Sequence, residues 1–197
     1  MAIMTPPRPR GRQPKPAGVT PEDLLNTEDG DRFELIDGKL VERNMGQKSS
    51  GLALVINSRI VGTVPRNIAW VGQSDTGFRI FPDPSMVRSA NGSYTSRNRL
   101  PGGVPFEGYS TVAPELVLEV VSPNDKADDV GAKALLWLRA GVAVVWVVYP
   151  AGRYVQVWRA TGEIVVRRED DVLDGEDVIP GFTMPVADIF EPLNPPS

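Results

Sequence analysis

The stretch ELVLEVVSP, Glu115–Pro123, decides the fold of this chain. Side chains alternate along a strand, so Val117, Glu119 and Val121 point to one face and two leucines and a valine to the other. Both faces are apolar, which predicts a central strand covered on each side. A carboxylate buried there without a partner would cost several kcal/mol or be forced neutral. The sequence therefore predicts that Glu119 holds a partner.

The residues after this strand predict a helix and a second buried strand. Ser122 or Asn124 can cap a helix over about residues 126–140, acids follow at its start, and Gly141 can end it. The run VAVVWVVYP, residues 142–150, is again apolar on both faces. A strand, a helix and a strand in this order predict a right-handed crossover between parallel strands.

The flanking segments predict a mixed α/β domain. Two alternating runs around Asp37-Gly38 and the segment 153–160 indicate N-terminal and C-terminal hairpins. Apolar spacing and capping residues predict helices near residues 20–26 and 48–64. Residues 68–73 and 77–81 read as short strands, whereas 82–103 is rich in turn formers and could be a loop with a short strand inside it. We expect one domain over residues 19–191 and a short tail at 192–197.

The composition excludes several classes of active site. The chain contains no cysteine and no histidine, which rules out disulfides, thiolate zinc sites, histidine metal clusters and Ser-His-Asp triads. Any chemistry must come from Asp, Glu, Lys, Arg, Ser, Tyr or a bound ion.

Charge is distributed unevenly along the chain. Residues 1–17 carry four basic side chains and no acid, which gives this tail a charge of +4. Because the net charge of the whole chain is −4, the rest of the chain carries −8. Residues 1–18 are rich in Pro, Arg and Gly, and we expect them to be disordered. An acidic body is not typical of a general nucleic-acid binder. No apolar run approaches the ~18 residues of a membrane span, no signal peptide is evident, and we expect a cytoplasmic protein.

Four segments together resemble the Uma family of putative restriction endonucleases, within the PD-(D/E)xK nuclease superfamily. They are FELIDGKLVERNMG, APELVLEVVSPND, KALLWLRAGVAVVWVVYP and DGEDVIPGFTMPVADIF, in this order. The resemblance covers about residues 20–191 and implies a restriction-endonuclease-like core, a Mg²⁺ or Mn²⁺ site and DNA as substrate. It implies that Glu119 is the acid of the (D/E)xK element, that Lys133 supplies its lysine from the following helix, and that Glu34 is the acid of the first strand. We also expect a homodimer.

These residue types suit phosphodiester hydrolysis, because Mg²⁺ held by carboxylates neutralises the phosphate and a lysine can orient the attacking water. Each of these residues could instead have a role that involves no metal. Glu119 could be a satisfied buried acid paired with Lys133 or an arginine. Glu34 could form a hairpin ion pair with Lys39 or Arg43, and Lys133 could be an exposed helix lysine.

The chain departs from the family pattern at the metal aspartate. The family segment resembles VRxPDVSFVxRxRL, whereas this chain reads MVRSANGSYTSRNRL. The register places Ala90 at the proline, Asn91 at the aspartate and Gly92 at an apolar strand position, which we expect to loosen that stretch. An asparagine carbonyl can ligate a metal but brings no charge, so Mg²⁺ binding should weaken greatly. Asp83, in the literal Pro-Asp pair of a turn, is a candidate substitute.

We therefore expect an endonuclease of the Uma type that is weak or inactive because of Asn91. Its catalytic candidates are Glu119, Lys133 and Glu34, and its metal candidates are Glu119 and Asn91. The alternative is a non-catalytic DNA-binding or self-association module on the same fold.

Overall fold

A six-stranded mixed sheet forms the centre of the molecule, whose computed structural model describes residues 18–43 and 46–195. The strand order is β10-β9-β8-β7-β6-β3. The strands are β3 (Ala69–Gln73), β6 (Gly92–Ser96), β7 (Leu116–Val120), β8 (Val144–Tyr149), β9 (Tyr154–Arg159) and β10 (Ile164–Arg168). β7 runs parallel to β8, and the other neighbours are antiparallel. The quoted stretch is thus a central strand, as predicted.

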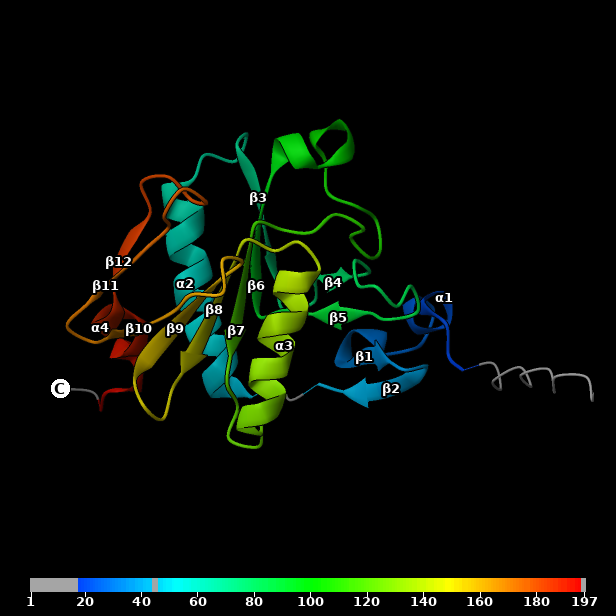
Figure 1. Cartoon of the computed structure of the whole chain (residues 1–197), viewed down its shortest axis with the longest axis horizontal. Helices are drawn as coiled ribbons and strands as arrows, with labels where there is room; N and C mark the ends of the chain where they lie inside the picture. The colour runs from blue at the N-terminus through cyan, green and yellow to red at the C-terminus, as the bar shows by residue number, and fades with distance from the viewer. Residues whose placement is uncertain (1–17, 44–45, 196–197) are drawn as a thin grey trace, which may run out of the picture.

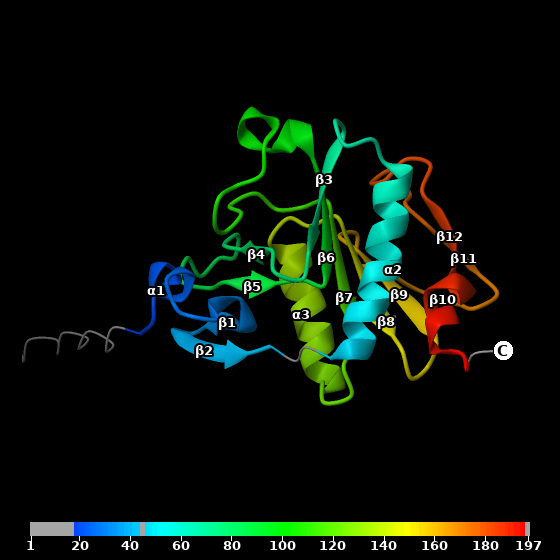
Figure 2. The ribbon, with the colours of Figure 1, turned by 180° about the vertical axis from the view of Figure 1, so that it is seen from behind.

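One long helix covers each face of this sheet. Helix α3 (Ala127–Arg139) lies in front of the central strands in Figure 1, and α2 (Gln47–Thr63) lies in front of them in the reverse view of Figure 2. The side chains of β7 divide between the two layers. Leu116 and Leu118 belong to the core cluster on the α2 side, and Val117 packs with Trp137 of α3 on the other side. Burial on both faces explains why this strand is apolar throughout.

Helix α3 connects the parallel strands β7 and β8, as predicted, but its N-cap is Lys126, without a side-chain cap, and not Ser122 or Asn124. Two acids in the first turn of α3, Asp128 and Asp129, suit the positive end of the helix. The helix ends before Gly141, whose φ of +96° is a conformation that glycine adopts without strain. This crossover fixes α3 across the face of β7 that carries Glu119.

A smaller N-terminal layer lies beside the main sheet. It contains α1 (Pro21–Leu25), the hairpin of β1 (Phe33–Ile36) and β2 (Lys39–Glu42), and the short strands β4 (Gly77–Phe78) and β5 (Arg88–Ser89). The hairpin turns through Asp37 and Gly38, both at positive φ, as the Asp-Gly signal predicted. Leu35 exchanges backbone hydrogen bonds with Val87 and is fully buried with Leu24 and Val87 in a cluster of its own.

The segment 82–103 contains more structure than predicted. It holds β5 and also β6, which lies between β3 and β7 in the main sheet. The sequence GSYTS hides this role because only Tyr94 on one face joins the apolar core. Gly92 pairs regularly with Gln73 and Leu118, so the expected loosening is wrong. The predicted strand at 77–81 is also shorter, since β4 ends at Phe78.

The C-terminal segment closes the far end of the sheet (Figure 1). It comprises β11 (Val172–Asp174), β12 (Thr183–Pro185) and α4 (Val186–Phe190). Short 3-10 turns occur at Gly30–Arg32, Arg97–Arg99, Pro101–Gly103 and Glu191–Leu193. The prediction for residues 1–17 lies outside the described residues. Within the described part of the chain, no helix is both long and apolar enough to cross a membrane.

Candidate active site

Glu119 has its partners on α3. The Lys133 ammonium lies 2.9 Å from Glu119 Oε1 and 3.0 Å from Oε2, and the Trp137 indole N–H donates to Oε1 at 2.7 Å. Lys133 and Trp137 are four residues apart, so they project from the same face of the helix toward the strand. Both carboxylate oxygens of Glu119 are therefore engaged by side chains of one helix.

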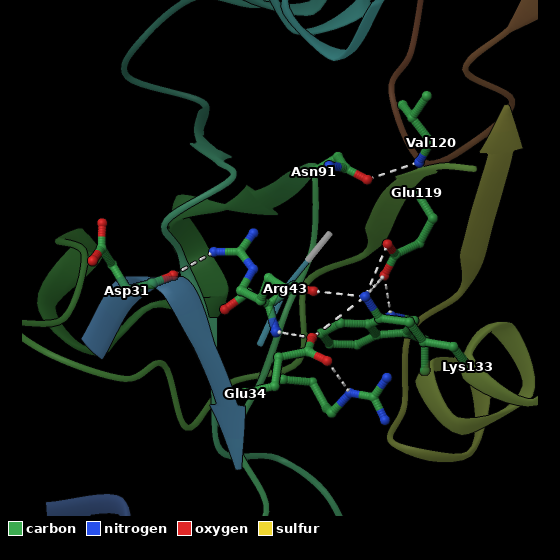
Figure 3. Close-up of polar contacts among 10 residues, drawn as sticks. Asp31, Glu34, Arg43, Asn91, Glu119, Val120 and Lys133 are labelled. Atoms are coloured by element: carbon green, nitrogen blue, oxygen red, sulfur yellow. Dashed lines mark hydrogen bonds and ion pairs between the residues drawn. The ribbon is translucent and has the colours of Figure 1, made fainter. Parts of the chain in front are cut away.

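Lys133 also connects Glu119 to the N-terminal layer. Its ammonium donates to the Ser89 carbonyl at 3.0 Å and lies 3.4 Å from Glu34 Oε1. Figure 3 shows the Lys133 nitrogen between the two carboxylates, with Glu119 on one side and Glu34 on the other. The three predicted side chains thus converge, although they come from α3, β7 and β1.

Glu34 is a buried acid with two cations and a backbone donor. Arg88 Nε lies 2.9 Å from its Oε2, and the Ser89 N–H donates to Oε1 at 2.9 Å. Its ion-pair partners are therefore Arg88 and Lys133, not the Lys39 and Arg43 considered from sequence. Burial opposes ionisation of Glu34, but the charges of Lys133 and Arg88 outweigh it and lower the pKa of this carboxyl.

Burial dominates the ionisation of Glu119. It raises the pKa of the Glu119 carboxyl, Lys133 counteracts part of that shift, and the nearby charge of Glu34 adds to it. Two carboxylates close to one ammonium thus respond in opposite directions. The difference follows from their surroundings, because Glu34 has a second cation and a backbone N–H, whereas Glu119 has one cation and an indole.

Asn91 lies next to this cluster but does not join it. Its side-chain carbonyl accepts a hydrogen bond from the Val120 backbone N–H at 2.8 Å. In Figure 3 the Asn91 amide reaches toward Val120, apart from the Glu119 carboxylate and Lys133. Its own backbone carbonyl accepts from the buried Asn57 amide at 3.2 Å. Asn91 therefore ties the approach to β6 to strand β7 and helix α2.

A cleft of about 870 Å³ opens beside the cluster and reaches it at Ser89. Its walls come from α1, β3 and the loop after Leu100, and three aspartates, Asp29, Asp31 and Asp75, lie along it. Asp83 lies outside this lining, in the turn between β4 and β5. There its Oδ1 accepts hydrogen bonds from the backbone N–H and hydroxyl of Ser85.

Comparison with known proteins places this arrangement in a family. The family model described as Uma2, putative restriction endonuclease, matches residues 21–187. The chain belongs to the Uma2 family. The whole fold also superposes on the crystal structure of a putative nuclease belonging to DUF820 from Anabaena variabilis, with a TM-score of 0.74 and 22% identity. That match covers 89% of this chain and 99% of the other. No curated protein matches the chain.

Nucleases of the restriction-endonuclease type generally use divalent metals, so the fit of a metal to this Uma2 site can be tested. Mg²⁺ requires oxygen ligands with net negative charge. Here Lys133 neutralises Glu119, Asn91 Oδ1 is engaged by Val120, and the oxygens of Glu34 contact Arg88, Ser89 and Lys133. Across residues 18–43 and 46–195, no three acidic side chains gather as a metal site. The residues as arranged do not fit Mg²⁺.

The sequence predicted Glu119, Lys133 and Glu34 as site residues but did not predict the residues that bind their side chains. Trp137 was not among the predicted site residues, although its spacing from Lys133 could have placed it on the same helical face. Arg88 and Ser89 were overlooked because the turn-rich segment 82–103 does not indicate where a strand within it would lie. What roles these residues have in a reaction stays a prediction.

Proposed function

We propose that this Uma2 protein is a DNA endonuclease whose phosphodiester hydrolysis with Mg²⁺ is weak or lost. The proposal rests on family membership and on one local observation. The Asn91 oxygen accepts from the Val120 N–H, and the register of the resemblance predicts that this neutral amide stands in place of the family's metal aspartate. A lost anionic ligand lowers affinity for a hard cation steeply.

The remaining residues still suit interaction with a phosphate. The Lys133 ammonium is oriented by Glu119, Glu34 and the Ser89 carbonyl. An oriented cation can stabilise charge that develops on a phosphate oxygen. Glu119, with its raised pKa, is suited to exchange a proton at a pH nearer neutrality than an ordinary glutamate. Neither residue replaces the missing charge at Asn91.

A non-catalytic module on the same fold is the second candidate. It is favoured by the charge of the cleft, whose lining holds three aspartates and, among the described residues, no lysine or arginine. Such a lining repels a phosphate backbone, and DNA affinity depends largely on phosphate contacts. The module would then bind DNA through another surface or bind a second copy of the chain.

The experiment compares nicking of supercoiled plasmid by the unchanged protein and by Asn91→Asp, in Mg²⁺ and in Mn²⁺. A carboxylate at 91 can keep the bond to Val120 and add a charge near Glu119. We expect little or no nicking by the unchanged protein and measurable nicking by Asn91→Asp. Glu119→Gln is the blank, and thermal unfolding of each variant verifies folding.

Two outcomes would change the assignment. Robust cleavage by the unchanged protein that disappears in Glu119→Gln would show that a residue other than Asn91 completes the site. Asp83 is the first candidate for that residue, and Asp83→Asn would test it. If neither form cleaves DNA, the non-catalytic module becomes the better account.

A further inference from the structure

Three residues with hydroxyl side chains, each buried overall, form the floor of the cleft beside the Lys133 cluster. Ser89, Ser93 and Thr95 line it and are only 6%, 3% and 4% exposed. None of these hydroxyls forms a hydrogen bond with a described residue. Gly72 makes room for the Ser93 hydroxyl, because a Cβ there would lie 2.5 Å from it. A hydroxyl can both donate and accept a hydrogen bond, so this floor is suited to a polar ligand.

Carboxylates surround the opening of the same cleft. The side chains of Asp29, Asp31 and Asp75 are exposed and form no ion pair with any described residue. In Figure 3 the Asp31 carboxylate points away from Arg43, which binds only its backbone carbonyl. The rim thus has three carboxylates that form no ion pair with the described part of the chain.

The walls of the cleft contain aromatic side chains, which are its third feature. Trp70, Phe106 and Tyr109 contribute to the walls, and Trp70 is 41% exposed on the edge strand β3. Aromatic faces attract cations, arginine above all. Carboxylates and hydroxyls accept the five N–H groups of a guanidinium. Together, the rim, floor and walls match arginine side chains and disfavour phosphate groups.

We propose that this cleft binds the arginine-rich N-terminal segment of the same chain, residues 1–17. That segment carries Arg8, Arg10, Arg12 and Lys15 without a single acid, so its +4 complements the three aspartates of the rim. Leu24 and Leu25 of α1 are themselves part of the cleft wall. The attachment point of the segment is therefore close to the site in sequence.

The length of the segment is sufficient. An extended chain spans at most about 3.3–3.6 Å per residue, or roughly 20 Å over six residues. Arg12 lies six residues before Gly18, and Leu24 of the cleft wall lies six residues after it. The segment can therefore turn back from Gly18 and reach the cleft with Arg12, and further in with Arg10 and Arg8. The assignment does not depend on whether the chain cleaves DNA.

The test uses a fluorescent peptide of residues 1–17 and the full chain with the four basic residues of its own segment changed to glutamine. Fluorescence anisotropy at about 0.15 M salt, where the Debye length is about 8 Å, measures peptide binding. We expect the chain with the glutamine substitutions to bind the peptide saturably. Adding Asp29→Asn/Asp31→Asn/Asp75→Asn to that chain should weaken binding at least ~10-fold, because each removed carboxylate is a direct partner of a basic side chain of the peptide. The unchanged full chain should also bind at least ~10-fold more weakly, because its own segment competes at an effective concentration near the millimolar range.

A charge-matched control separates the cleft from the general acidity of the body. Asp170→Asn/Asp177→Asn/Asp188→Asn removes three exposed aspartates that do not line the cleft. In the chain with the glutamine substitutions, we expect this control triple variant to bind the peptide as tightly as that chain does without it. Equal loss in both triple variants would overturn the site, and equal affinity with and without the native segment would overturn its occupancy by this chain. A dimer that depends on the segment, detected by sedimentation, would assign the occupant to a second copy.

Discussion

Lys133 balances the charge of the cluster, because its ammonium contacts two carboxylates that burial would otherwise drive toward the neutral form. Removing one member of a buried ion pair leaves the others without compensation. The side chain of Glu34 is only 9% exposed and contacts both Arg88 and Lys133. Its contribution to stability should therefore be large and should depend on pH.

We predict that Glu34→Gln lowers the free energy of unfolding by on the order of 3 kcal/mol at pH 7. The folded-state pKa of Glu34 is lowered from its ordinary 4.5, so its ionised form stabilises the fold above that pH. As the pH falls below 4.5 and through the folded-state pKa, the unchanged protein loses this contribution. The difference between the two proteins should then shrink, as urea unfolding from pH 7 to pH 3 would measure.

Glu107→Gln provides the comparison for that series. Glu107 is exposed and forms no ion pair with a described residue, so its substitution should alter the free energy of unfolding by less than ~0.5 kcal/mol throughout. A difference between Glu34→Gln and the unchanged protein that stays constant from pH 7 to pH 3 would contradict the assigned pKa shift.

At the residue scale, sequence identified the acids and the lysine but not how their charges are satisfied. A glutamate inside an apolar strand signals a partner, and the family register pointed to Lys133. The register also placed Asn91 at the metal position, yet its amide instead bonds to the Val120 N–H. That bond depends on how two strands approach each other in space, which residue types along the chain do not encode.

Strand β6 packs against helix α2 through a close approach at Gly92. A Cβ at Gly92 would lie 2.8 Å from Asn57 Nδ2 and closer still to Oδ1. Asn57 is buried on α2, and its amide bonds to the Asn91 carbonyl. The glycine thus allows helix and strand to pack closely at the base of the candidate site.

We predict that Gly92→Ala destabilises the protein by about 1–3 kcal/mol, since the inserted methyl must displace the Asn57 amide. Urea unfolding measures the change. In an Asn57→Ala background the same substitution should cost less than ~1 kcal/mol, because the obstructing atoms are gone. Gly51→Ala on α2, where an added methyl meets no atom within 4 Å, should stabilise the protein by roughly 0.5–1 kcal/mol. Equal costs for Gly92→Ala in both backgrounds would refute the contact with Asn57.

Elements with strong local signals were predictable, and β6 was not. The hairpin at Asp37-Gly38, α3 with its end before Gly141, and the two-faced strand β7 all follow from turn chemistry, capping and periodicity. The face of β6 opposite Tyr94 is polar because Ser93 and Thr95 line the cleft. Its apolar signal is therefore too weak to distinguish it from a loop.

At the scale of the whole molecule, the candidate site joins two layers with separate cores. Glu119 and Lys133 belong to the main sheet and α3, whereas Glu34 belongs to the N-terminal layer with its own cluster of Leu24, Leu35 and Val87. The small core buries far less apolar surface than the clusters around the main sheet. Regions with fewer buried apolar contacts open at lower free energy.

We predict that the N-terminal layer opens without unfolding of the main sheet. Leu35 is fully buried, so Leu35→Ala should destabilise the layer by about 2–5 kcal/mol. Native-state hydrogen exchange should then show faster exchange for amides of β1 and β2, while β7 and β8 keep most of their protection. Val147→Ala is the control in the main sheet, because Val147 on β8 is as buried as Leu35. This substitution should accelerate amide exchange in both layers. If Leu35→Ala accelerates β7 and β8 as much as β1, the two layers unfold together, and the Glu34 contact with Lys133 is part of one cooperative unit.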